Sequence, residues 1–118
     1  MTYSFENLEV WQRSRSLVKQ VYKATSSFSN EEKFGLTSQL GRAAVSVSSN
    51  IAEGSTRCSK NDQARFYEIA FGSLMEVLNQ LILANDLNFL YNERLITLRK
   101  EIEETARMLN ALYNSTKR

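Results

Sequence analysis

Three basic residues spaced four apart are the side chains in this sequence best suited to an anionic partner. Arg15, Lys19 and Lys23 occupy positions i, i+4 and i+8, so in a helix they form one row, here called the cation ridge. Like charges at this spacing slightly destabilise a helix, and nothing inside the segment explains that cost. A row of exposed cations is ordinarily solvated surface. The functional alternative is a surface that neutralises successive phosphates of a nucleic acid.

A second basic group, Arg57, Lys60 and Arg65, surrounds the predicted start of a helix near residue 60. The free amide groups at a helix N-terminus also favour anions. The formal net charge is only +2, which does not identify a nucleic-acid-binding protein by itself. The choice between solvated surface and a phosphate-binding surface therefore depends on how the charges are distributed.

The segment 36–54 carries two ordered faces when it is read as a helix. One is an apolar stripe, and the other is a polar stripe about 120° away at helical spacing. Amide and hydroxyl groups recur on it, whereas a freely solvated face usually carries Lys and Glu. We therefore interpret it as a contact surface toward a neighbouring helix or another subunit, with simple solvation as the alternative. This polar face comprises Gln39, Arg42, Ser46, Asn50 and Glu53.

Catalytic and metal-binding chemistry find little support in the sequence. There is no His, and Cys58 is the one cysteine, so neither a zinc site nor a nucleophile–His pair is predicted. No phosphate-binding loop with Gly-Lys is present either. We predict a non-enzymatic protein without a metal or cofactor.

Four amphipathic helices are predicted to position these groups. They cover residues 8–26, 36–54, 60–87 and a last segment that begins near Asn92, its expected cap. Ser59 followed by Asp62 is a helix start signal. Because the connections are short, the economical architecture is an all-α, antiparallel up-down-up-down four-helix bundle forming a single domain over residues 1–118.

The apolar spacing also predicts which side chains form the core. The first helix is expected to bury a stripe that includes Trp11, Val18 and Tyr22. The third is expected to bury Ile69 and Leu87 among others, with another backbone close to Gly72. The last helix carries leucines and isoleucine at alternating spacings of three and four, the pattern of a bundle seam.

Composition sets the broad class. The chain of 118 residues has 42% hydrophobic residues, no Pro and 4 Gly, which suits one helical domain. No apolar run has the ~18 residues of a membrane span, and no signal-peptide pattern begins the chain. Together with a lone cysteine, this predicts a cytoplasmic protein that does not enter a membrane.

Four segments of the chain resemble a known protein family. They are Phe5-Glu-Asn-Leu-x-Val-Trp, Glu32-Lys-Phe-Gly-Leu-x-x-Gln39-Leu, Arg42-Ala-Ala-x-Ser46-Val-x-x-Asn50-Ile-Ala-Glu-Gly54 and Phe66-x-x-Ile-Ala70-x-Gly-Ser73-Leu-x-Glu76. The sequence is similar to the bacterial four-helix-bundle family encoded in intervening sequences of 23S ribosomal RNA genes. Ser29 departs from the family pattern, because relatives often have Pro after the preceding Phe.

The resemblance implies an assembly and two classes of function. Family members are described as homopentameric rings, and the family is similar to the accessory protein of diversity-generating retroelements, which binds nucleic acid and a reverse transcriptase. A ring would repeat each basic group several times, which makes RNA or DNA binding compatible with a modest net charge. The alternative is a protein-interaction scaffold that binds another protein and no nucleic acid.

Overall fold

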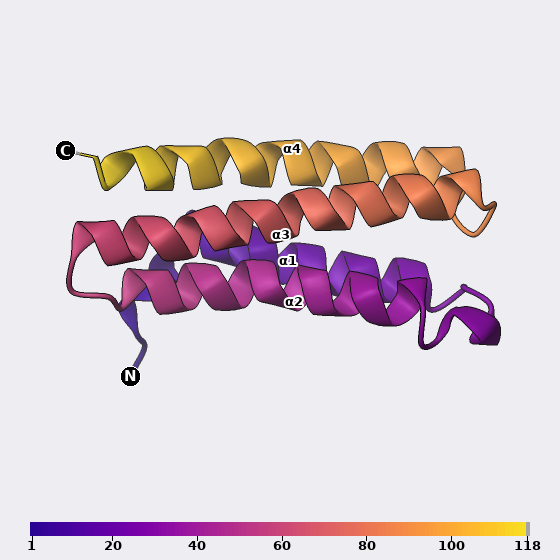
Figure 1. The fold of residues 1–118 in the computed structure, drawn as a ribbon, viewed down its shortest axis with the longest axis horizontal. Helices are drawn as coiled ribbons and strands as arrows, with labels where there is room; N and C mark the ends of the chain where they lie inside the picture. Colours follow the sequence, from indigo (N-terminus) through magenta and orange to yellow (C-terminus); the bar gives the residue numbers. More distant parts are fainter. Residues whose placement is uncertain (118) are drawn as a thin grey trace.

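The protein is described over residues 1–117 by a computed structural model, and this part of the chain is helical with no strand. Its long helices are α1 (Glu9–Thr25), α2 (Leu36–Ser55), α3 (Lys60–Asp86) and α4 (Asn92–Ser115). Short 3-10 turns, η1 (Ser4–Asn7) and η2 (Asn30–Glu32), precede α1 and α2. The helices lie side by side and alternate in direction, which confirms the predicted up-down-up-down bundle (Figure 1). The bundle measures 44 × 25 × 22 Å.

Serine side chains cap the starts of α3 and η2, and the sequence predicts the first of these caps. Ser59 Oγ accepts a hydrogen bond from the backbone N–H of Asp62 at 3.1 Å, which satisfies one free amide of α3. Ser29 Oγ accepts from the N–H of Glu31 at the start of η2. The Ser59 contact explains why α3 begins where the sequence predicts.

The predicted cap of α4 is wrong by one residue. Tyr91 precedes the helix without a side-chain cap, and Asn92 is its first residue. The Asn92 Oδ1 atom accepts a hydrogen bond from Asn85 Nδ2 at 2.7 Å instead. This side chain therefore ties the end of α3 to the start of α4 rather than capping a helix.

All four long helices contribute to one hydrophobic core. Each helix turns apolar side chains inward, and removing this surface from water is the main source of stability. The largest fully buried apolar side chains are Leu17, Val21, Leu40, Val47, Ile51, Leu74, Val77, Leu81, Leu98, Ile102 and Leu109.

Three residues predicted in the core are exposed. Tyr22 is 56% exposed, and Ile69 and Leu87 also face outward. Helix α1 carries two neighbouring apolar stripes, and the inward one runs through Val10, Leu17 and Val21. Trp11 and Val18 lie half-buried at its flank, so sequence spacing identified a helix but misjudged its rotation.

Small residues allow close approach at two positions but not at Gly72. A Cβ atom placed on Gly54 would lie 2.7 Å from Tyr67 Cε1, and one on Gly41 would lie 3.1 Å from the Tyr22 hydroxyl oxygen. At Gly72 nothing lies within 4 Å, so the predicted close approach there is absent within the subunit. Within residues 1–117, no helix is both long and apolar enough to cross a bilayer.

Candidate nucleic-acid interface

The cation ridge lies on the outer surface of α1. Arg15, Lys19 and Lys23 are all exposed. Within the described chain, none of them pairs with a carboxylate, and the one interaction of their side chains places the Arg15 guanidinium 5.5 Å from the Trp11 ring centroid. Three cations without acidic partners remain available for anionic groups from outside the subunit.

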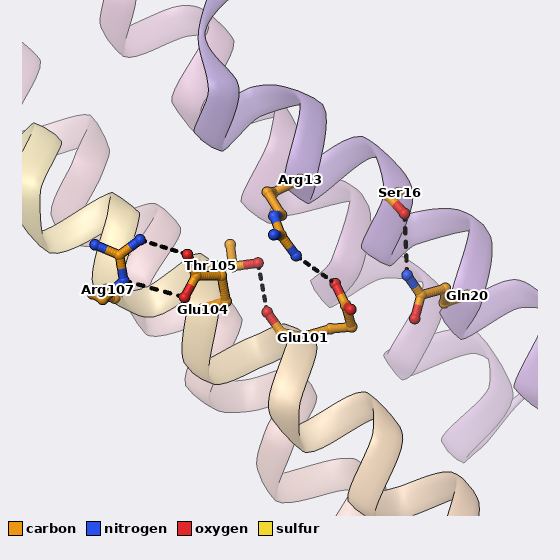
Figure 2. A network of polar contacts seen from close by, with 7 residues as sticks. All are labelled: Arg13, Ser16, Gln20, Glu101, Glu104, Thr105 and Arg107. Atoms are coloured by element: carbon orange, nitrogen blue, oxygen red, sulfur yellow. Dashed lines mark hydrogen bonds and ion pairs between the residues drawn. The ribbon is translucent and has the colours of Figure 1, made fainter.

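Contacts on two other sides of α1 fix the direction of the ridge. Val10, Leu17 and Val21 bury the inward face, and Arg13 pairs with Glu101 of α4 at 3.1 Å. Figure 2 shows this ion pair bridging the two helices. The ridge points away from the core because both of these sides are already occupied.

One turn further along α4, the next ion pair joins two residues of the same helix. The Arg107 guanidinium donates two hydrogen bonds to the Glu104 carboxylate, and this lowers the pKa of Glu104 (Figure 2). Thr105, buried beside them, donates its hydroxyl to the Glu101 carbonyl at 2.8 Å. Glu101 and Glu104 of α4 are thus each paired with an arginine, the first with Arg13 of α1 and the second with Arg107 of α4.

The second basic group has a different environment. Arg65 pairs with Asp62 at 2.8 Å, and Arg57 lies 3.9 Å from Glu53. Both guanidinium groups also lie against the Phe66 ring, at 4.5 Å and 5.0 Å from its centroid. Lys60 is exposed at the first residue of α3. Because its two arginines already have carboxylate partners, this group offers less uncompensated charge than the ridge.

The polar face of α2 lies mainly along the seam with α3. Ser46 Oγ is hydrogen-bonded to Ser73 Oγ at 2.8 Å, and Asn50 Nδ2 donates to Ser46 within α2. Gln39 Oε1 accepts from Gln80 Nε2 at 3.3 Å. Ser46, Asn50 and Gln39 therefore have hydrogen bonds inside the subunit, and Glu53 lies 3.9 Å from Arg57. Gln39, Arg42 and Glu53 are exposed at the surface.

An apolar groove between α1 and α2 was missed by the sequence analysis. It has a volume of about 640 Å³, and Phe34 beside it is 89% exposed. Tyr22 and Val45 add exposed apolar surface, and Lys33 and Arg42 place two cations in its lining. The sequence did not indicate this groove, because Tyr22, which lines it, was predicted to lie in the core.

The cation ridge continues into a hollow at the end of the bundle. Lys23 lines this end hollow together with Arg94 of α4 and the exposed Tyr91. Arg94 and Tyr91 were not predicted as site residues, because they lie about seventy positions from Lys23 in sequence and meet it only through the fold.

The described residues contain no cluster of acidic residues and cysteine suited to a metal ion. Cys58 is a free, exposed thiol beside Arg57.

Comparison with known proteins gives one family and one fold. A sequence model of the family described as 23S rRNA-intervening sequence protein matches residues 6–111. The chain is similar in structure to a protein of unknown function from the S23 ribosomal protein family of Bacteroides thetaiotaomicron VPI-5482. The TM-score is 0.79 at 20% identity, over 88% of this chain and 97% of that one. Curated proteins give no match.

Proposed function

The chain belongs to the family of 23S rRNA-intervening sequence proteins, and on this premise we propose that it is a non-catalytic, oligomeric protein that binds RNA or another nucleic acid. The observation that carries the proposal is the cation ridge. Arg15, Lys19 and Lys23 share one exposed face of α1 and have no carboxylate partner within the described chain. Each cation that contacts a phosphate releases condensed counterions and so favours binding.

Assembly would raise the affinity of such a small surface. Three cations on one subunit form a modest site, but a closed ring presents the same ridge several times to one long polyanion. A pentamer is the assembly that the resemblance implies. Linked copies bind more tightly than one copy because the later contacts are intramolecular.

The subunit contact that we propose joins the apolar groove to the outer face of α3 on a second copy. A head-to-tail contact needs two unlike surfaces. The groove combines apolar side chains with the cations Lys33 and Arg42. The outer face of α3 combines exposed Ile69 and Leu83 with the carboxylate of Glu76. The two surfaces are therefore complementary in both apolar character and charge.

A protein-interaction scaffold is the second candidate, and the apolar groove is the observation that favours it. Exposed apolar surface of this kind marks protein contacts more often than nucleic-acid contacts. In that case the groove binds a different protein, and the cation ridge is solvated surface.

The salt dependence of RNA binding tests the proposal. Wild-type protein is titrated with a labelled hairpin RNA at several salt concentrations, and Lys19→Gln is compared with Lys100→Gln. Both lysines are exposed, so each variant loses one surface charge, but Lys100 lies on α4 away from the ridge. Lys19→Gln should flatten the log–log salt slope by about 0.9 for paired and about 0.7 for single-stranded segments. Lys100→Gln should leave the slope unchanged.

The outcomes separate the two candidates. Absence of wild-type binding at ~50 mM salt, where electrostatic binding is strong, would reject the nucleic-acid function and favour the scaffold. If Lys19→Gln and Lys100→Gln have the same salt slope, RNA binding is retained as the function, but the cation ridge is not the binding surface.

A further inference from the structure

The end hollow is positively charged and small. It has a volume of about 270 Å³ and lies where α1 ends beside the connection between α3 and α4. Its described lining contains the cations Lys23 and Arg94, two serines and apolar side chains, and no carboxylate. This volume is just below the ~300 Å³ at which small-molecule pockets begin, so the hollow suits one ring system rather than an extended ligand.

The connection that forms one wall of the hollow is held in place by hydrogen bonds. Asn85 Nδ2 donates to the Leu90 carbonyl at 2.9 Å and to Asn92 Oδ1 at 2.7 Å. The N–H of Phe89 donates to the Ala84 carbonyl at 2.8 Å. These bonds fix the residues on both sides of Tyr91, so its ring projects from a rigid base.

The floor of the hollow is also anchored in the fold. The Phe89 ring packs against the buried Phe28, with 5.8 Å between the ring centroids. Leu90 is buried. The hollow therefore has a fixed apolar floor below a polar rim.

Tyr91 presents its ring to solvent beside two cations. It is 85% exposed, and no ring or hydrogen-bond partner of its side chain occurs within residues 1–117. A single exposed aromatic residue is unremarkable by itself. Here the ring shares one hollow with Lys23 and Arg94, and Lys23 is also the last member of the cation ridge. Aromatic faces combined with cations are the elements that bind unpaired nucleotides.

We propose that the end hollow receives one unpaired base of a nucleic acid whose backbone follows the cation ridge. The base stacks on Tyr91, and Lys23 and Arg94 contact the phosphates on either side of it. The inference rests on the proposed nucleic-acid function and adds the class of ligand. The protein binds loops, bulges or single-stranded ends in preference to a fully paired duplex.

Two oligonucleotides and two variants test this inference. The probes are an RNA hairpin with an unpaired loop that carries 2-aminopurine, and a blunt duplex of the same length. Tyr91→Ala removes the stacking ring, and Tyr91→Phe retains it without the hydroxyl. Because Tyr91 is exposed, neither change disturbs the core, and helical content serves as the check.

Wild-type protein should bind the hairpin more tightly than the duplex and change the 2-aminopurine fluorescence. Tyr91→Ala should weaken hairpin binding by about 5- to 150-fold, the effect of losing one base stack, while duplex binding stays within twofold. Tyr91→Phe should behave as wild type.

Each contrary outcome identifies what fails. If wild type binds hairpin and duplex equally and Tyr91→Ala changes neither, the base site is rejected while the nucleic-acid function survives. If wild type binds neither the hairpin nor the duplex, both the base site and the nucleic-acid function are rejected.

Discussion

Gly54 of α2 packs directly against the Tyr67 ring of α3, where a Cβ atom would lie 2.7 Å from Cε1 and 2.9 Å from Phe66 Cβ. Gly54→Ala should therefore lower the free energy of unfolding by about 1–3 kcal/mol, because the helices must separate. The measurement is chemical denaturation with circular dichroism.

Gly72→Ala is the matched control for this change. Gly72 also lies inside a helix but has open space around it, so Ala should raise stability by up to about 1 kcal/mol through its higher helix propensity. If Gly72→Ala instead destabilised the protein and dissolved an oligomer, Gly72 would belong to the subunit contact.

The hydrogen bond between Ser46 and Ser73 should couple α2 to α3. Ser46→Ala leaves the Ser73 hydroxyl without its 2.8 Å partner, and Ser73→Ala does the reverse. A double-mutant cycle with both alanines should give a coupling energy of about 0.5–1.5 kcal/mol. A coupling near zero would show that these hydroxyl groups bond equally well to water.

Gln80 should lower the stability of the seam that it occupies. It is 4% exposed, and its Oε1 atom has no hydrogen-bond partner although its Nε2 reaches Gln39 and Glu76. Gln80→Leu should raise the free energy of unfolding by about 1 kcal/mol, since an unsatisfied buried acceptor is removed.

Gln80→Glu should have the opposite effect. It places a second carboxylate beside Glu76 in a buried position, which raises the pKa of the new group. The destabilisation should thus be small at about pH 4 and grow as the pH rises through that pKa. A stability equal to wild type at neutral pH would mean that water reaches this position.

The proposed subunit contact predicts the effect of a charge in the apolar groove. Val45→Glu should convert the oligomer to monomer without loss of helix, because Val45 is exposed on α2 within that groove. Ile96→Glu makes a similar exchange at an exposed site on α4 and should leave the assembly intact. Sedimentation velocity provides the measurement. A wild-type monomer at all concentrations would reject the ring, and an unchanged Val45→Glu oligomer would place the contact elsewhere.

Helical periodicity predicted most of the fold but not the rotation of every helix. The starts of α2 and α3 follow from Gly35 and Ser59, which interrupt or cap the chain locally. Tyr22 could not be placed correctly, because the choice between two adjacent apolar stripes on α1 depends on where α2 and α4 pack. That information is not contained in the spacing of α1 alone.

The candidate site was predictable only where it lies on a single helix. The cation ridge follows from the spacing of four residues within α1. The pairing of Arg65 with Asp62 had a sequence signal in their i, i+3 spacing, which was overlooked. By contrast, Lys23 and Arg94 meet across the end of the bundle, and no local pattern could join them.

The order of helix contacts has a consequence for how this protein is made. Helices consecutive in sequence pack against each other, and α1 with α4 is the one distant pair among the long helices of residues 1–117. Chains dominated by such near-neighbour contacts fold in about microseconds to milliseconds. Each subunit should therefore finish folding long before it meets a second copy at cellular concentration. In the proposed ring, assembly would be the slow, concentration-dependent step, so the rate of synthesis would control how many subunits are assembled.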